Sequence, residues 1–173
     1  YLNICKKMKQ KKISGGLRKK IFLKKNKKNL PLVSIITVVL NNKKFLQQSI
    51  NSVLNQSYKN YELIIIDGKS TDGTLEILKK NNLKIDFWIS AKDRGIYDAM
   101  NKGIDIANGN WIIFMNSGDV FFDEKVLIEF KLNNFSEFDV VYGDTIIDTN
   151  EFGYMQNSKY FGRKTICNKF KGS

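Results

Sequence analysis

The chain has 173 residues, of which 42% are hydrophobic and 27% are charged, and this balance excludes a disordered or fibrous protein. Its longest apolar run, Val33 to Leu40, is far shorter than the roughly 20 residues needed to cross a bilayer, so we expect no transmembrane helix. The absence of histidine and the distant placement of Cys5 and Cys167 exclude a Cys/His zinc site or a histidine base within this segment and indicate free thiols.

The net charge of +12 comes from the N-terminal residues. Residues 1–30 hold 12 Lys or Arg and no acidic residue, whereas the rest of the chain holds 17 basic and 17 acidic residues. We expect a basic arm that is either solvated or bound to an anionic membrane surface, and the sequence leaves these two alternatives equally open. Ile13, Leu17 and Ile21 would give a helix one apolar edge, although two glycines between them disfavour that helix.

Nucleic acid is a weaker alternative for the arm, because it has only two aromatic residues to stack on bases. The N-terminus also lacks an apolar segment followed by a small-residue cleavage site, so a secretory signal is not supported. We therefore expect a cytoplasmic protein, peripheral at the inner membrane surface if the arm binds lipid. Because the first residue is Tyr1 rather than Met, we expect a fragment or a processed chain.

From Pro31 onward, buried strands alternate with amphipathic helices. The β-branched run at 33–39 is typical of a strand covered on both faces, and helical spacing is clearest over 96–107. In chain order the predicted elements are strand 33–39, helix 44–55, strand 61–66, a helix through 75–78, strand 87–90, helix 96–107, strand 111–115, a helix through 126–130, and strands at 140–142 and 145–147. This alternation implies βαβ units and a mainly parallel sheet, so the predicted fold class is α/β.

Polar residues follow the first four predicted strands at their carboxyl ends, where open parallel sheets bind ligands. They are Thr37 with Asn41 after the first strand, Asp67 after the second, Asp93 after the third and Asp119 after the fourth. Because clustered carboxylates repel one another, we expect a divalent cation or a hydrogen-bonding ligand at this rim. Mg²⁺ or Mn²⁺ held by one or two carboxylates and by substrate phosphates would suit a diphosphate ligand.

Each acidic residue has a structural alternative. Asp119 is the candidate metal ligand, or it caps the following helix. Asp67 would accept hydrogen bonds from a base imide or from ribose hydroxyls, or it is only a turn residue. For Asp72 we favour a helix cap over a ligand contact.

The segment after the third strand offers further candidates. Asp93 and Arg94 would lie near the base or the phosphates, although a surface ion pair explains Arg94 nearly as well. Asn101, with Asp98 and Lys102, either lines the cleft or belongs to a solvated face. Neither a P-loop nor G-x-G-x-x-G follows a strand, which argues against a P-loop NTPase or a dinucleotide-dependent dehydrogenase.

Several stretches occur in a familiar order between Pro31 and Asp148: VSIITVVLNN, SINSVLNQSY, YELIIIDGKSTDGT and DRGIYDAMNKGIDIANGNWIIFMNSGD. Together they resemble the family 2 glycosyltransferases, and they look closest to the bacterial branch that builds capsule, exopolysaccharide or lipopolysaccharide sugars. The resemblance implies the three-layer GT-A fold, a nucleotide-diphosphate sugar donor, a divalent metal (Mn or Mg), a glycan or lipid-linked acceptor, and inversion at the anomeric carbon.

By position, the resemblance implies that Thr37 and Asp67 contact the nucleoside, that Asp93 lies near the base, and that Asp119 meets the metal or the diphosphate. In inverting members a carboxylate further along the chain deprotonates the acceptor hydroxyl. The metal stabilises the departing diphosphate.

Two motifs depart from the family pattern. Its paired Asp after the second strand is Asp67-Gly68 here, and its Asp-X-Asp-Asp run is Asn116-Ser117-Gly118-Asp119. No residue after Asp148 matches the base motif, so the catalytic residue is left unassigned and transfer is expected to need residues beyond Ser173. The predicted division is a basic arm (1–30), a nucleotide-sugar-binding domain (31–158) and a truncated or diverged tail (159–173).

The direct alternative to an enzyme is a non-catalytic or truncated nucleotide-sugar-binding module. A second alternative is a protein that binds nucleic acid through its basic arm, with the α/β body as a scaffold. A phospho-acceptor receiver domain modified at Asp67 shares the fold class, but the chain lacks an acidic pair after the first strand.

Overall fold

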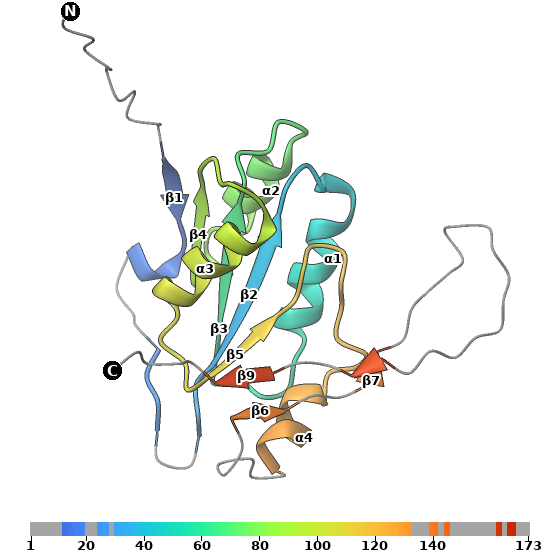
Figure 1. Ribbon diagram of the computed structural model, residues 1–173. Helices are drawn as coiled ribbons and strands as arrows, with labels where there is room; N and C mark the ends of the chain where they lie inside the picture. Colours follow the sequence, from blue (N-terminus) through green and yellow to red (C-terminus); the bar gives the residue numbers. More distant parts are fainter. Residues whose placement is uncertain are drawn as a thin grey trace, which may run out of the picture.

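The computed structural model describes residues 12–19, 24–27, 30–132, 139–141, 144–145, 162–163 and 166–168. A seven-stranded sheet in the order β1-β4-β3-β2-β5-β9-β6 lies at its centre (Figure 1). Four neighbouring strands run parallel: β4 (Phe87–Ser90), β3 (Tyr61–Asp67), β2 (Val33–Val39) and β5 (Trp111–Phe114). The predicted α/β fold with a mainly parallel sheet is confirmed.

Helices cover both faces of the sheet, so the molecule has three layers. On one face pack α1 (Lys43–Leu54), α2 (Thr74–Lys80) and α4 (Val126–Leu132). On the other face lies α3 (Ile96–Ile106), which approaches closely because a Cβ atom on Gly103 would be only 2.4 Å from Cγ2 of Ile36. β2 and β3 are therefore buried along their whole length, as their β-branched sequences predict.

The N-terminal segment corrects one expectation. Residues Ile13–Gly15 form strand β1, antiparallel to β4, and Leu17–Lys19 form a 3₁₀ turn, so the amphipathic helix considered for this segment is wrong in the part that the structure describes. Without β1, β4 would be the edge of the sheet with unpaired backbone groups. Pairing along that edge explains why a strand forms here.

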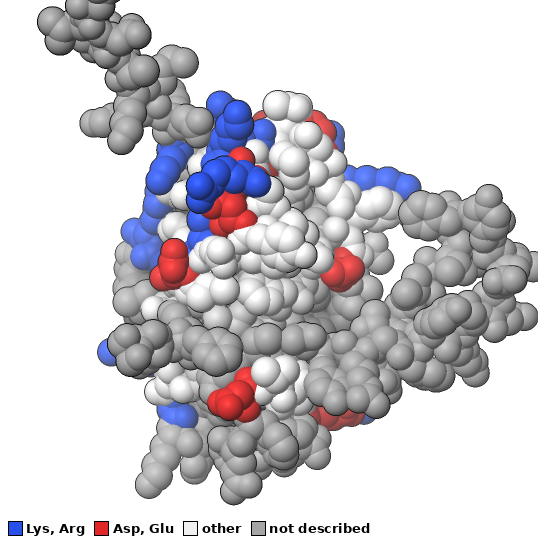
Figure 2. Space-filling model, in the orientation of Figure 1, with Lys and Arg blue, Asp and Glu red and all other residues white. Residues whose placement is uncertain are grey.

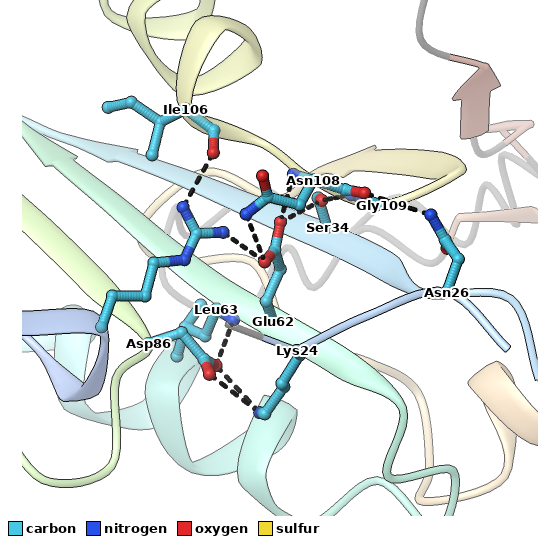
Figure 3. Close-up of polar contacts among 10 residues, drawn as sticks. Lys24, Asn26, Ser34, Glu62, Leu63, Asp86, Ile106, Asn108 and Gly109 are labelled. Atoms are coloured by element: carbon cyan, nitrogen blue, oxygen red, sulfur yellow. Dashed lines mark hydrogen bonds and ion pairs between the residues drawn. The ribbon is translucent and has the colours of Figure 1, made fainter. Parts of the chain in front are cut away.

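Two ion pairs to buried carboxylates attach this segment to the body (Figure 3). Arg18 pairs with Glu62, whose carboxylate also accepts hydrogen bonds from Oγ of Ser34 (2.5 Å) and from the backbone N–H of Asn108 (2.7 Å). Lys24 Nζ lies 3.0 Å from Asp86, whose carboxylate also accepts from the backbone N–H of Leu63. Both carboxylates are buried, so each receives its counter-charge from the basic segment.

The C-terminal part adds short strands. β9 (Ile166–Asn168) pairs antiparallel with β5, and β6 (Val140–Val141) pairs with β9. β7 (Asp144–Thr145) and β8 (Gly162–Arg163) form a separate two-stranded sheet. Strand β9 thus joins the main sheet from within the predicted tail, while the predicted division into arm, domain and tail stays a prediction.

Among the described residues, no helix is long and apolar enough to span a bilayer. The first eleven residues, where part of the arm was predicted, and most of residues 146–173 lie outside the described part of the chain.

Candidate functional site

The sheet topology singles out the region beyond the carboxyl ends of β2 and β5. The chain adds β3 and then β4 on one side of β2 and returns to place β5 on the other side, so the direction of winding reverses beside β2. Open α/β sheets bind ligands at such a switch point. Backbone hydrogen bonds join the strand ends there: Gly68 donates to Val39 O (2.9 Å) and Ser117 donates to Val38 O (3.1 Å).

Asp67 ends β3 and is completely buried. Both of its carboxylate oxygens accept hydrogen bonds from the N–H of Ser70, and Oγ of Ser70 and Oγ of Ser90 each donate at 2.5 Å. In this geometry Asp67 fixes the loop after β3 to the end of β4. Its contact with a nucleoside stays a prediction.

Asp93 lies directly beside the end of β3. A Cβ atom on Gly68 would be 2.7 Å from Oδ2 of Asp93, so the carboxylate occupies the space that a side chain at position 68 would need. Its other oxygen, Oδ1, accepts from the N–H of Gly95 at 3.0 Å. The structure therefore brings Asp67 and Asp93 to adjacent positions at the rim.

Arg94 points to solvent, with 90% of its side chain exposed, and forms a surface ion pair with Asp98 at 3.3 Å. Asp98 also pairs with Lys102 at 2.8 Å. The hydrogen bond from Lys102, followed by those from Arg94, lowers the pKa of Asp98 to about 2. Asn101 lies on the exposed side of α3. These contacts match the alternative of a surface ion pair on a solvated helix face. Ligand contacts by Arg94 and Asn101 stay predictions.

Asn41 and Asn42 connect the loop after β3 with the turn after β5. The side-chain oxygen of Asn41 accepts from the N–H of Thr71 at 2.8 Å, and its own N–H donates to Oγ of Ser70. The side-chain amide of Asn42 donates to Ser117 O at 2.8 Å. Two successive residues thus hold the loop that follows Asp67 and the turn that carries Asp119.

Asp72 reinforces the same region from the helix side. Its Oδ1 accepts from the N–H and from Oγ1 of Thr74, and its Oδ2 accepts from the N–H of Lys43. These hydrogen bonds lower the pKa of Asp72, with the side chain of Thr74 as the largest cause. The N-cap residue of α2 is Gly73, so Asp72 is not the predicted cap; it bonds the first residue of α2 and also the first residue of α1.

Thr37 lies within β2 and not at its exit. Thr37 is 1% exposed, and it lies opposite Ile65 of β3 in the parallel pairing of the two strands. Its predicted contact with a nucleoside is not tested by this geometry.

Asp119 lies on an exposed turn after β5. Its Oδ2 accepts from the N–H of Asn116 at 3.0 Å, and Gly118 takes a φ of +107°, which favours glycine. The alternative role as a cap of the next helix is wrong, because α4 begins only at Val126.

Two side chains in this turn were not predicted as site residues. Within the part that the structure describes, Oδ1 of Asn116 and Oγ of Ser117 are buried yet have no hydrogen-bond partner. Buried polar atoms are nearly always paired in proteins, so these two orphans beside Asp119 indicate groups that a ligand would satisfy. The signal in the sequence that could have identified them is that both are polar and follow a buried strand.

The described residues contain no group of three or more His, Cys, Asp or Glu side chains that could hold a metal ion. A cation at Asp119 would therefore take most of its ligands from neutral oxygens, water or a bound phosphate. Mg²⁺ is commonly bound in this manner at phosphate sites.

Comparisons with known proteins identify a family and a fold for this chain. The family model described as Glycosyl transferase family 2 matches residues 34–172. A PGL/p-HBAD biosynthesis glycosyltransferase of Mycobacterium bovis (strain BCG / Pasteur 1173P2) is 32% identical over 147 residues, which are 80% of this chain and 57% of that protein. A protein of Bacillus subtilis (strain 168) named for teichuronic acid biosynthesis, TuaG, is 37% identical over 100 residues, 56% of this chain and 39% of its own. The chain thus spans about half the length, or less, of these relatives.

Among solved structures, the mannosyltransferase PcManGT from Pyrobaculum calidifontis, in complex with GDP-Man and Mn²⁺, superimposes with a TM-score of 0.63. It is 17% identical, and the match covers 80% of this chain and 44% of that chain. At this identity the similarity concerns the fold, which is the GT-A fold.

Proposed function

The chain belongs to glycosyl transferase family 2, and from that premise we propose that it is the donor-binding half of an inverting glycosyltransferase. Its donor would be a nucleoside-diphosphate sugar and its acceptor a glycan or a lipid-linked glycan in cell-surface polysaccharide synthesis. The observation that carries the proposal is the Asn41-Asn42 junction, which holds the loop after Asp67 and the turn of Asp119 at the switch point of the sheet. The teichuronic acid relative supports the polysaccharide assignment.

In this proposal Asp67 and Asp93 recognise the nucleoside. A carboxylate accepts a hydrogen bond from the ring N–H that both uracil and guanine carry on the Watson–Crick edge, which favours UDP or GDP over ADP or CDP. Asp93 is the more accessible of the two, because Asp67 is completely buried. Thr37, Asn41, Arg94 and Asn101 complete the proposed donor site.

The residues of the turn after β5 fit a divalent metal. Asp119 offers a carboxylate at an exposed position, and the orphaned oxygens of Asn116 and Ser117 lie in the same turn. Such oxygen donors suit Mn²⁺ or Mg²⁺ better than softer metals. When bound, the ion would neutralise the charge that develops on the departing diphosphate.

We assign no catalytic base among the described residues. In an inverting reaction a carboxylate would take the proton of the acceptor hydroxyl, and this chain covers 57% of its Mycobacterium bovis relative. The activity of the whole protein is therefore part of the proposal, with a donor-binding module that lacks catalysis as the alternative.

Calorimetric titration of the 173-residue chain with UDP and with GDP, each with Mn²⁺ and then with EDTA, tests the donor site. We expect one of the two nucleotides to bind and Mn²⁺ to strengthen its binding. Asp119→Asn should remove most of the Mn²⁺ effect, whereas Asp105→Asn, at an exposed position on α3, should not. If neither nucleotide binds, the proposal is wrong.

We further propose a cytoplasmic location with peripheral contact to an anionic membrane surface. In Figure 2 lysine and arginine side chains gather at the upper left of the visible face, where Figure 1 draws β1, β4 and α3. Because the helix considered for this segment does not form, any membrane contact would rest on charge and not on an apolar helix edge.

A further inference from the structure

Helix α1 and the residues just after it carry polar side chains on a side that is buried. Ser49 and Gln56 are each 1% exposed, and Ser52, between them, is half-buried. The spacing of three residues places Ser49 and Ser52 on one face of the helix, and Gln56 follows two residues after the helix ends at Leu54. Buried polar side chains of this kind need partners, and here the partners lie in the chain after β5.

The segment from Asn116 to Lys125 runs beside α1 without forming a helix, and its course from β5 to α4 is visible in Figure 1. Oγ of Ser49 accepts from the N–H of Gly118 at 2.8 Å, and Oγ of Ser52 accepts from the N–H of Phe121 at 3.3 Å. The side chain of Gln56 accepts from the N–H of Leu127 at 3.1 Å and donates to Asp123 O at 2.5 Å.

We propose that this polar row, consisting of Ser49 and Ser52 on α1 and Gln56 just after it, positions the Asp119 turn for the metal and the diphosphate. The inference rests on the proposed donor site and adds residues that act through Asp119 and not by touching the ligand. Ser49 is the key member, because the peptide N–H that it holds belongs to Gly118, the residue directly before Asp119.

The geometry of the turn explains why one hydroxyl matters. Gly118 has a positive φ, so its peptide planes are oriented in a way that few residues adopt. The hydrogen bond that the N–H of Gly118 donates to Oγ of Ser49 fixes the peptide plane between Ser117 and Gly118, and the carbonyl of that plane accepts from Asn42. Loss of the hydroxyl would leave the N–H of Gly118 without its acceptor and let the turn, with its carboxylate, shift.

Ser34 provides a matched control. Like Ser49 it is a buried serine whose Oγ accepts from a glycine N–H, that of Gly109, at 2.9 Å. It lies near the start of β2, at the opposite end of the strand from the site, and its other partner is Glu62. Ser34→Ala and Ser49→Ala therefore remove the same kind of hydrogen bond in two places.

The test is the affinity for the nucleoside diphosphate that binds the unaltered chain, measured with Mn²⁺ and with EDTA, and the affinity for the corresponding nucleoside. Ser49→Ala should lower the Mn²⁺-dependent affinity by at least about threefold, the effect of one ordinary hydrogen bond, and leave nucleoside affinity unchanged. Ser34→Ala should reduce thermal stability at least as much without changing the Mn²⁺ effect. A purely structural role for Ser49 would not separate the two ligands.

Three outcomes remain distinguishable. If the unaltered chain binds no nucleoside diphosphate, the proposed function fails and the inference fails with it. If it binds and Ser49→Ala retains the full Mn²⁺ effect, the inference alone is overturned. Should Ser49→Ala not fold, Ser52→Ala, which removes a longer bond from a less buried side chain, must show a smaller loss of the same kind or the inference is wrong.

Discussion

Gly68 gives a physical reason for one departure from the family pattern. The family resemblance leads to the expectation of a second Asp at this position, but here the space is filled by the carboxylate of Asp93, 2.7 Å from where a Cβ atom would lie. A second carboxylate would collide with Asp93 and repel it. The absence of a side chain at Gly68 therefore allows Asp93 to lie against the end of β3.

We expect Gly68→Ala to displace Asp93 while the fold persists. Gly68 does not have a positive φ, so an alanine backbone is acceptable, and the colliding atom is the end of a side chain. If Asp93 makes a charged hydrogen bond to the base, affinity for the bound nucleoside diphosphate should fall about tenfold or more, as measured by calorimetry.

A double-mutant cycle separates this effect from general damage. Asp93→Asn should weaken binding to a similar degree, and adding Gly68→Ala to it should cost little more, because both changes act on one carboxylate. Fully additive losses would show that Gly68 acts by another route.

At the scale of elements, a buried ion pair attaches the N-terminal strand β1 and the 3₁₀ turn after it to the central sheet. Arg18 is 10% exposed at its side chain and Glu62 is 1% exposed, and the matched family region begins only at residue 34. A buried carboxylate that loses its partner is left as an uncompensated charge, which is strongly destabilising. The segment from Lys12 to Lys27 is thus part of the folded body where the structure describes it.

Arg18→Ala should lower the free energy of unfolding by about 3 to 5 kcal/mol, the range for breaking a buried ion pair, in urea denaturation. Adding Glu62→Gln should recover part of that loss, because it removes the unpaired charge. Lys19→Ala, at the exposed neighbouring position, should stay within about 0.5 kcal/mol of the unaltered chain. Equal effects of the changes at 18 and 19 would contradict a specific role for the ion pair.

The central strands and helices were predictable because their periodicity is local. The β-branched runs of β2 and β3 and the spacing of α3 gave bounds within one or two residues of those observed. Strand β1 was not predictable, because Ile13–Gly15 is short and its partner β4 lies far along the chain. The polar row of Ser49, Ser52 and Gln56 could not be recognised from the sequence, because only the fold shows that the chain after β5 covers it.

The candidate site, like the fold, could be predicted from the sequence only in part. Asp67, Asp93 and Asp119 could be predicted as candidates because each follows a strand, and the parallel order of β2 to β5 puts those strand ends at one edge. Their hydrogen bonds could not be read from the sequence, since the donors to Asp67 come from Ser70 and from Ser90 on another strand. The burial of Asp67 is a tertiary property for the same reason.

At the scale of the whole molecule, a basic residue adds to the outer surface charge only if it is not already paired with a carboxylate. The chain carries +12, and residues 1–30 hold 12 of its basic residues. Arg18 and Lys24 pair with buried carboxylates and so contribute little to an outer basic surface. Any attraction to an anionic surface must come from the remaining lysines, at about 1 kcal/mol for each one near the surface before losses.

We therefore expect the chain to float with vesicles that contain phosphatidylglycerol and not with phosphatidylcholine vesicles, and to be released by high salt, which screens surface charge. Replacing Lys6, Lys7, Lys9 and Lys11 with Gln should remove most of the binding. The same change at Lys79, Lys80, Lys84 and Lys125, all exposed elsewhere, alters net charge equally and should remove much less. Equal losses of vesicle binding from both sets would contradict a localised basic arm. Such a result would mean that binding depends only on net charge and not on where the lysines lie.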